Sequence, residues 1–337
     1  MQFPVRAFRK PALAAVIGAI LCLAAVAPSR ALDMSQGRLN DLASANGFCI
    51  GQRISIEKVA REFPELRGPL LQAETVFRVR MGPGCDHVRA TLIRTVGEGH
   101  YAEMSDRATD GVLAHLAASS FGYDAARVFV DTLNARAQGD IPSPVIETML
   151  AARYDKAPEQ EILNGFTSTY SSADHPKSLG VDLLLSLPLS WKAEDGQRPH
   201  VLKQWTSLNG HGMEAINVVI RDLQGYSVTR AEVEEVATMD QIGSMLPGGA
   251  RPISVMATQI DGEEAILVEF DFTVKRLSAD MIGRAKQLMV FHRGKMILLG
   301  CMTMVEASDG TLAARYEKMV PVCDLVDNSL VLRSKYQ

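Results

Sequence analysis

Two strand–turn–strand segments in the C-terminal half constrain the fold of this chain more than any other feature. Strand-like runs at 252–260 and 263–274 flank Asp261-Gly262, and the run 286–305 turns at Arg293-Gly294. Two-residue connections that contain glycine are typical of β-hairpins, because glycine adopts positive φ without strain. Since hairpin strands pair antiparallel, we expect a mostly antiparallel sheet in this half.

Further strand-like segments precede these hairpins. They are residues 181–187, the alternating run 200–208, and 213–223, which follows the turn NGHG at 209–212. A helix is expected at 229–246, where Thr229 and Glu232 form a T-x-x-E capping box. The predicted order is therefore three strands, a helix, four strands and a final helix.

The last strand and the last helix are expected to be joined covalently. Residues 296–305 are apolar at almost every position, which indicates a central strand covered on both faces. Pro321 lies within the helical stripe that follows, so we expect the helix to kink or restart there. Cys301 on the strand and Cys323 on the helix would then meet, and a disulfide between them would contribute roughly 3 kcal/mol. The apolar stripe consists of Leu312, Tyr316, Met319, Cys323, Val326 and Leu330.

Both tryptophans lie around the first predicted hairpin. Pro188-Leu189-Ser190-Trp191 is expected to end one strand, 192–198 to form a loop, and Trp205 to lie on the interior face of the next strand. We expect Trp191 and Trp205 to fill the core. The alternative is a partner-binding surface that they form with Arg198 and His200, because exposed aromatic and arginine side chains are enriched at interaction hot spots.

The N-terminus has the order of a secretory signal peptide. Arg6, Arg9 and Lys10 precede an uncharged apolar segment, and Ser29 and Ala31 are the small residues of a cleavage site. The apolar segment is shorter than the about 20 residues that a membrane-spanning helix needs. We expect residues 1–31 to be removed and the protein to be periplasmic or secreted. An uncleaved anchor is the alternative, and the signal segment would then be the membrane contact.

Residues 32–174 are predicted to form a helical domain, followed by a domain of strands and helices at 175–337. The helical part is expected to contain about five to seven helices with short connections. Residues 125–133 have the spacing of an amphipathic helix, and Gly139 is expected to end it. The predicted fold class is therefore α+β, a helical domain followed by a mostly antiparallel sheet flanked by helices.

Export changes what the cysteines are expected to do. Without Cys22 of the signal segment four remain, an even number in an oxidising compartment, where disulfides form. Of the three possible connectivities, proximity in sequence favours Cys49–Cys85 and Cys301–Cys323, one in each half. Four buried free thiols are the alternative, and metal binding is less favoured because the chain contains no C-x-x-C.

Short segments of the C-terminal half carry a family resemblance. They are "LLLSLPLSWK", "GEEAILVEF", "KMILLGCM" and "LVDNSLVL", the last with the tail Ser329-Leu330-Val331. Their order and the Pro-x-x-Trp strand end resemble the PsbP/DcrB-like α/β sandwich over residues 176–337, and "RPHVLKQW" and "IPSPVIE" resemble segments of uncharacterised exported bacterial proteins. The resemblance implies a group used mainly as accessory and docking modules. It implies no reaction, since fold alone does not define function.

No motif identifies a catalytic, cofactor or metal site. The chain contains no G-x-S-x-G, H-E-x-x-H, P-loop or G-x-G-x-x-G. A triad of Ser190 or Ser207 with His200 and Asp195 would be a chance arrangement among many serines. A net charge of −4 and scattered basic residues exclude the basic face that nucleic-acid binding requires.

Five methionines gather near the C-terminal hairpin: Met281, Met289, Met296, Met302 and Met304. We expect them to pack in the core, and a methionine-lined site for copper or a flexible ligand is the alternative.

We therefore expect an exported, non-enzymatic accessory module of the bacterial cell envelope, whose partner is another envelope protein. Two other classes stay open: a periplasmic hydrolase with its site between the two domains, and a carrier of a small apolar ligand. A polar cleft with converging Ser, His and carboxylate groups would favour the hydrolase, a closed apolar cavity the carrier, and an exposed apolar patch the docking module.

Overall fold

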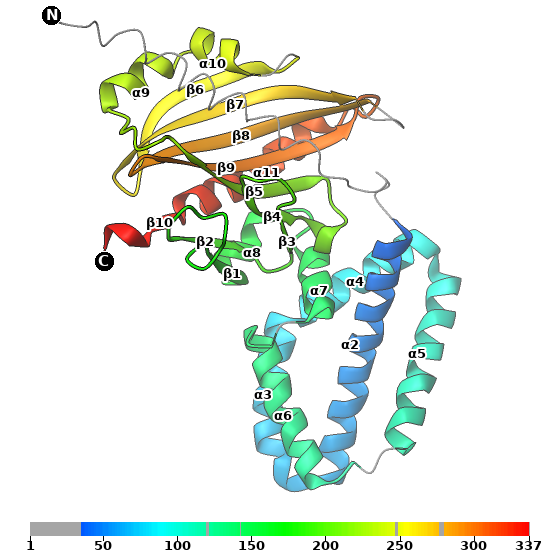
Figure 1. Cartoon of the computed structure of the whole chain (residues 1–337). Helices are drawn as coiled ribbons and strands as arrows, with labels where there is room; N and C mark the ends of the chain where they lie inside the picture. The colour runs from blue at the N-terminus through cyan, green and yellow to red at the C-terminus, as the bar shows by residue number, and fades with distance from the viewer. Residues whose placement is uncertain (1–34, 119–120, 142, 247–248, 276–279, 337) are drawn as a thin grey trace, which may run out of the picture. The chain divides into compact units, whose positions relative to one another are not determined.

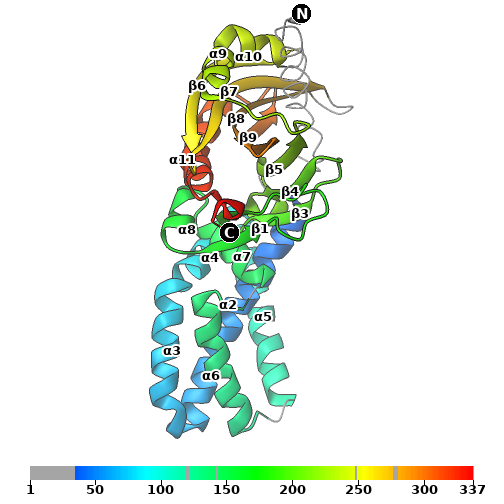
Figure 2. The same ribbon diagram turned by 60° about the vertical axis from the view of Figure 1, so that its left-hand side comes forward.

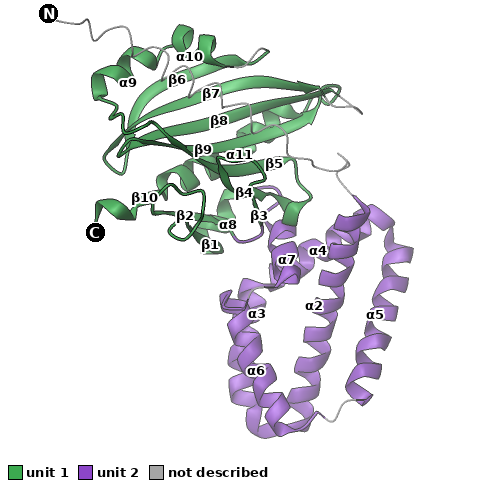
Figure 3. Cartoon of the chain, in the orientation of Figure 1, with its two compact units in different colours: residues 1–31, 158–188, 192–337 green, residues 32–157, 189–191 purple. Residues whose placement is uncertain are grey.

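The computed structural model describes residues 35–118, 121–141, 143–246, 249–275 and 280–336, so the predicted signal peptide at 1–31 lies outside the described residues. The chain divides into two compact units (Figure 3). The helical unit contains Leu32–Ala157 and Leu189–Trp191, and the α+β unit contains Pro158–Pro188 and Lys192–Gln337. A helical region followed by antiparallel sheets with helices confirms the predicted α+β fold class.

The helical unit consists of helices joined by short connections. They are α2 (Gln36–Glu62), α3 (Arg67–Arg80), α4 (Gly82–Val96), α5 (Glu98–Ala118), α6 (Tyr123–Gln138) and α7 (Pro144–Arg153), with the short 3₁₀ helix η3 (Pro64–Leu66). Gly139 ends α6 in the left-handed conformation at φ 86°, as expected of a C-terminal glycine. Cys49 of α2 and Cys85 of α4 form a disulfide that joins the two helices.

The α+β unit contains two antiparallel sheets. Three strands form the smaller sheet in the order β1-β2-β10: β1 (Thr167–Ser171), β2 (Leu183–Pro188) and β10 (Val331–Leu332). Seven strands form the larger sheet in the order β3-β4-β5-β9-β8-β7-β6. They are β3 (Lys192–Asp195), β4 (Val201–Thr206), β5 (Glu214–Asp222), β6 (Arg251–Ile260), β7 (Glu263–Lys275), β8 (Asp280–His292) and β9 (Lys295–Glu306). As predicted, β9 is central and buried at nearly every position.

The two predicted glycine turns are present. Asp261 and Gly262 have φ of 50° and 71° between β6 and β7, and Arg293 and Gly294 have 47° and 70° between β8 and β9. Positive φ at both central residues is the geometry that matches the twist of a two-residue hairpin. These turns set the register of the four longest strands.

Two expectations for the region between the halves were wrong. The range 32–174 is not entirely helical, because Thr167–Ser171 forms β1 and pairs with β2. The strands on either side of Trp191 do not form a hairpin, because β2 pairs with β1 and β10 whereas β4 pairs with β3 and β5. The predicted loop contains β3, whose side chains are exposed at the edge of the larger sheet. A short apolar strand carries no signal for which sheet it joins, so the pattern alone could not separate them.

Four helices accompany the sheets. They are α8 (Glu159–Leu163), α9 (Arg230–Val236), α10 (Met239–Met245) and α11 (Leu312–Asn328). The capping box at Thr229 and Glu232 starts α9 as predicted. The predicted interruption at Pro321 is absent as an element boundary, because α11 continues through it. Cys301 of β9 and Cys323 of α11 form the second disulfide.

Successive side chains of a strand point to opposite faces, and the two faces of the larger sheet have different neighbours. The face that carries Lys286 and Cys301 packs on α11, and we call it the helix face. The opposite face packs on Val233 of α9 and Ile242 of α10, and we call it the methionine face. Figures 1 and 2 show α11 on one side of the sheet, with α9 and α10 beside β6 and β7.

Candidate functional site

The five methionines singled out in the sequence all lie on one face of the larger sheet. Met281 and Met289 of β8 and Met296, Met302 and Met304 of β9 belong to one buried apolar cluster. Met213 and Met245 pack against the same cluster. Methionine is flexible and polarisable, and surfaces rich in it adapt to ligands of different shape. This face therefore combines burial with an adaptable lining.

A row of polar residues crosses this apolar face, and we call it the amide row. Gln204 of β4 pairs with Asn217 of β5, Asn217 pairs with Gly300 of β9, and Gly300 pairs with Gln287 of β8. Gly300, which carries no side chain, separates the two amide residues in the row. The backbones of Asn217 and Gln287 are two strand spacings apart, about 10 Å.

The amides of Asn217 and Gln287 are buried without hydrogen-bond partners. Each residue is only 1% exposed. Neither the nitrogen nor the oxygen of either amide has a partner within the part of the chain that the structure describes. Leaving a buried polar group unpaired costs about 1–3 kcal/mol. Buried polar groups in folded proteins are nearly always paired, so four unpaired atoms in one row call for a partner from outside the fold.

The surroundings of the amide row are uncharged. From β4 to β6 the row itself and the two neighbouring rows on this face contain no ionisable residue. The members are Gln204, Asn217, Gly300, Gln287, Val268 and Val255; Thr206, Ala215, Met302, Ala285, Phe270 and Pro252; and Val201, Val219, Leu298, Met289, Ile266 and Ala257. Such rows can hold a neutral polar group by hydrogen bonds and an apolar body by packing.

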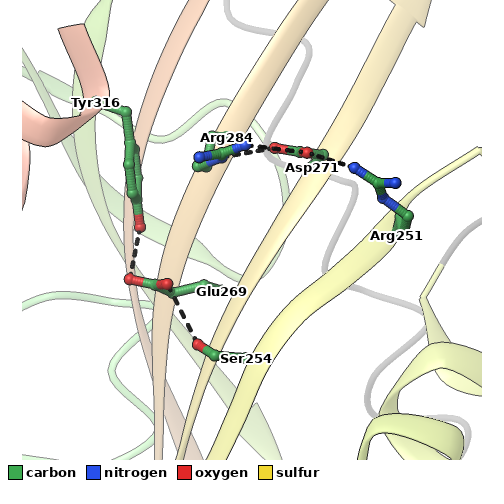
Figure 4. A network of polar contacts seen from close by, with 6 residues as sticks. All are labelled: Arg251, Ser254, Glu269, Asp271, Arg284 and Tyr316. Carbon is green, nitrogen blue, oxygen red and sulfur yellow. Dashed lines mark hydrogen bonds and ion pairs between the residues drawn. The ribbon is translucent and has the colours of Figure 1, made fainter. Parts of the chain in front are cut away.

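On the helix face, several ionisable groups of these strands form networks of ion pairs and hydrogen bonds. The Arg284 guanidinium binds Asp271 through two nitrogens, at 2.7 and 3.2 Å, and Arg251 lies 3.3 Å from the same carboxylate (Figure 4). Tyr316 of α11 donates to Glu269 at 3.0 Å, and burial followed by the charge of Glu269 raises the pKa of its hydroxyl. The charges of Arg284, Arg251 and Asp271 offset one another, and the hydrogen bond from Tyr316 to Glu269 joins α11 to the sheet.

Next to this network a buried lysine joins the sheet to α11. Lys286 is 5% exposed, donates to Asp324, and lies 3.3 Å from Asp327. Burial alone would lower the pKa of Lys286, but the hydrogen bond to Asp324 and the charge of Asp327 raise it. Burial raises the pKa of Asp327 to about 7, against the opposing effect of Lys286. The pair holds the helix beside the Cys301–Cys323 disulfide.

The four residues considered for partner binding do not form one exposed surface. Trp191 is 6% and Trp205 is 3% exposed, and Trp205 packs edge-to-face on Tyr170 with ring centroids 5.0 Å apart. Both tryptophans are therefore core residues. Arg198 is half-buried and His200 is exposed, so of the four only these two could meet a partner.

The serine triad considered from the sequence does not assemble. The Ser207 hydroxyl donates to Glu214 at 2.6 Å, and Asp195 is bound by Lys203 at 2.8 Å. Ser190 is buried and His200 is exposed. Each group therefore has surroundings that differ from those of a nucleophile and its base.

Another serine and histidine do meet at the C-terminal tail. The His292 ring nitrogen Nε2 lies 2.9 Å from Ser334 Oγ, and Nδ1 lies 3.3 Å from Glu263. Nδ1 nevertheless makes no hydrogen bond within the described residues, and Lys335 lies 3.0 Å from the same Glu263 carboxylate. The next residue, Tyr336, donates to Asp261 in the β6–β7 turn. This group anchors the tail to that turn.

Within the described residues, no group of three or more His, Cys, Asp and Glu side chains could hold a metal ion. In the same part of the chain, no helix combines the length and the apolar character needed to cross a membrane.

Sequence reasoning found the methionines but missed the amides. Asn217 and Gln287 interrupt otherwise apolar strands, "INVVI" and "KQLMVF", and Gly300 interrupts "LLGCM". Each interruption is a signal by itself, because amides are rare among buried residues. Only the strand order β5-β9-β8 and its register show that the three belong to one row.

Comparisons with known proteins assign this chain to no family. No protein-family model and no curated protein matches the sequence. Among solved structures, the C-terminal half is similar to PA94 of Pseudomonas aeruginosa, described as a protein of unknown function. The match has 15% identity and a TM-score of 0.22, and it covers 46% of this chain and 94% of that chain. Similarity at this level transfers no role.

Proposed function

We propose that this chain is an exported, non-enzymatic binding module of the bacterial cell envelope whose α+β unit carries a small, largely apolar ligand on the methionine face. The single observation behind the proposal is the pair of buried, unpartnered amides in an uncharged methionine-lined row. Of the three classes considered from the sequence, the carrier is the one that this arrangement favours.

Three further points support the proposal. The ionisable groups near α11 pair with one another, which argues against hydrolysis by that network. Two disulfides suit the oxidising compartment that the signal-like N-terminus predicts. We also propose that the C-terminal half belongs to the PsbP/DcrB-like group, on its element order and its Pro-x-x-Trp strand end. Docking to another envelope protein remains a prediction of that resemblance.

Binding of the fluorescent apolar probe N-phenyl-1-naphthylamine tests the proposal directly. The protein purified after export of the full chain is expected to bind the probe saturably. With ¹³C-methyl methionine, the resonances of Met289, Met302 and Met304 should shift on titration. Met239 and Met256, which are 44% and 54% exposed outside this cluster, serve as internal controls and should not move. No probe binding, or shifts confined to the two controls, would contradict the carrier role.

A variant with a side chain at position 300 is a second, independent test of ligand binding at the amide row. Gly300→Leu places a side chain between Asn217 and Gln287 and should abolish probe binding. Gly310→Leu is the matched control, since an added Cβ there meets nothing within 4 Å. Circular dichroism will report whether Gly300→Leu folds. If it does not, the methyl titration of the unaltered protein still decides.

A further inference from the structure

We infer that the ligand of the methionine face is an uncharged amphiphile that carries a primary amide or a urea group seated over Gly300. The inference rests on the proposed binding role and names the chemistry that the role requires.

The hydrogen-bonding demand of the two side chains defines the head group. Each amide of Asn217 and Gln287 presents an N–H₂ donor and a carbonyl acceptor, and all four atoms are buried and unpartnered among the described residues. A ligand group must therefore both donate and accept on each of two sides. A primary amide or a urea does so, since its carbonyl oxygen has two lone pairs that accept from the two side-chain N–H₂ groups and its own two N–H bonds donate to the two side-chain carbonyls. A carboxylate can only accept, so it would leave Oδ1 of Asn217 and Oε1 of Gln287 unpaired.

The absence of charge in the surrounding rows excludes ionic head groups. Transfer of an unpaired ion into an apolar site is far more costly than transfer of an amide. The amide row and its two neighbours contain no ionisable residue between β4 and β6, so neither a carboxylate nor an ammonium group would find a counter-charge there. We therefore expect the head group of the ligand to be neutral.

The sizes of the side chains next to the amide row indicate where the apolar part of the ligand lies. On one side the neighbouring row has Ala215, Met302 and Ala285 on the three central strands. On the other side the equivalent positions carry the bulkier Val219, Leu298 and Met289. Two alanines and a flexible methionine are smaller in total than the three large side chains on the other side. The body therefore extends over the alanines toward Met304.

Three probes with one alkyl chain and different heads test the inference. Decanamide, decanoate and decylamine are titrated against the exported protein by displacement of N-phenyl-1-naphthylamine. Decanamide should bind more tightly than either charged analogue by roughly 10- to 100-fold, the equivalent of one to two net hydrogen bonds to the amide row. Its binding should shift the methyl resonances of Met302 and Met304 more than those of Met289 and Met296.

Variants locate the preference in the two amides. Asn217→Leu with Gln287→Met replaces both by apolar side chains of similar size, so decanamide should lose its advantage while the naphthylamine probe still binds. Gln197→Met, at an exposed position of the β3–β4 connection, is the control and should keep the preference. Tighter binding of decanoate, or an unchanged preference in the double variant, would overturn the inference.

The two proposals fail in different ways. If the naphthylamine probe does not bind, the carrier role is wrong. If it binds and decanamide shows no preference, the methionine face carries ligands of another class, its amides are satisfied by ordered water, and only the inference about the head group is wrong.

Discussion

Charged residues on the helix face of the seven-stranded sheet are paired within the protein, and two buried amides on its methionine face differ from them. On the helix face, Arg284, Asp271 and Glu269 form ion pairs and hydrogen bonds with neighbours, and Lys286 lies between two aspartates of α11. On the methionine face, Asn217 and Gln287 have no partner among the described residues. Lys286 and Gln287 are consecutive residues of β8, so a paired and an unpaired polar side chain are separated by one peptide bond.

The difference separates polar groups that stabilise the fold from polar groups that are available to bind a ligand. A buried charge is tolerated only when it is paired, and on the helix face each pairing also fixes α11. A buried amide without a partner stabilises nothing in the free protein and costs about 1–3 kcal/mol. Buried polar groups that destabilise the free protein and form no structural contact are candidates for ligand binding. The following substitutions test this contrast, beginning with the largest expected effect.

Lys286→Met should be strongly destabilising. The substitution removes the cation and leaves Asp327, which is 7% exposed, buried without its partner. Breaking a buried pair on one side costs about 3–5 kcal/mol. Urea unfolding at pH 8, where Asp327 is least able to avoid the cost by protonation, measures the loss. A loss below about 1 kcal/mol would show that the pair is not a structural element of this face.

Removal of the Cys301–Cys323 disulfide should have the next largest effect. The bond closes a loop with a sequence separation of 22, for which chain entropy predicts about 3 kcal/mol. The double variant Cys301→Ala with Cys323→Ala should lose that stability in urea unfolding and keep binding of the naphthylamine probe, because the disulfide joins the helix face to α11, away from the methionine face. Loss of probe binding at a concentration of urea too low to unfold the variant would mean that the two faces are not independent.

The pH dependence of stability should reveal Asp327. Burial raises the pKa of this carboxyl to about 7 from 3.8, so the native state holds the proton more tightly than the unfolded chain does. The stabilising contribution is therefore present below about pH 4 and is lost as the pH rises through 7. Asp327→Asn should flatten the fall in the free energy of unfolding between pH 4.5 and 8. An identical pH profile for the variant and the parent protein would exclude Asp327 as the titrating group.

The sequence predicted the parts of this contrast that depend on local pattern. Glycine at Gly262 and Gly294 predicted the hairpins, and the apolar run of β9 predicted a central strand, because turn chemistry and alternation are local. The pairing of Cys301 with Cys323 followed from one strand and one helix. The first hairpin was predicted wrongly, since nothing local distinguishes β2 from a neighbour of β4. The amide row could not be predicted, because it depends on the order and register of three strands that are distant in the sequence.

Gln287→Met should have the smallest effect, and the opposite sign to Lys286→Met. Methionine has nearly the shape of glutamine, and it removes an amide whose nitrogen and oxygen are both buried without partners. The free energy of unfolding should therefore rise by about 1 kcal/mol, within the range that an unsatisfied group costs. Gln197→Met, at an exposed position, should change it by less than about 0.5 kcal/mol. If Gln287→Met were as destabilising as Lys286→Met, the amide would have a partner within the protein, and the contrast between the two faces would disappear. If it stabilises, the native sequence keeps a costly residue where a better packing one was available, which is expected when that residue is retained for a ligand.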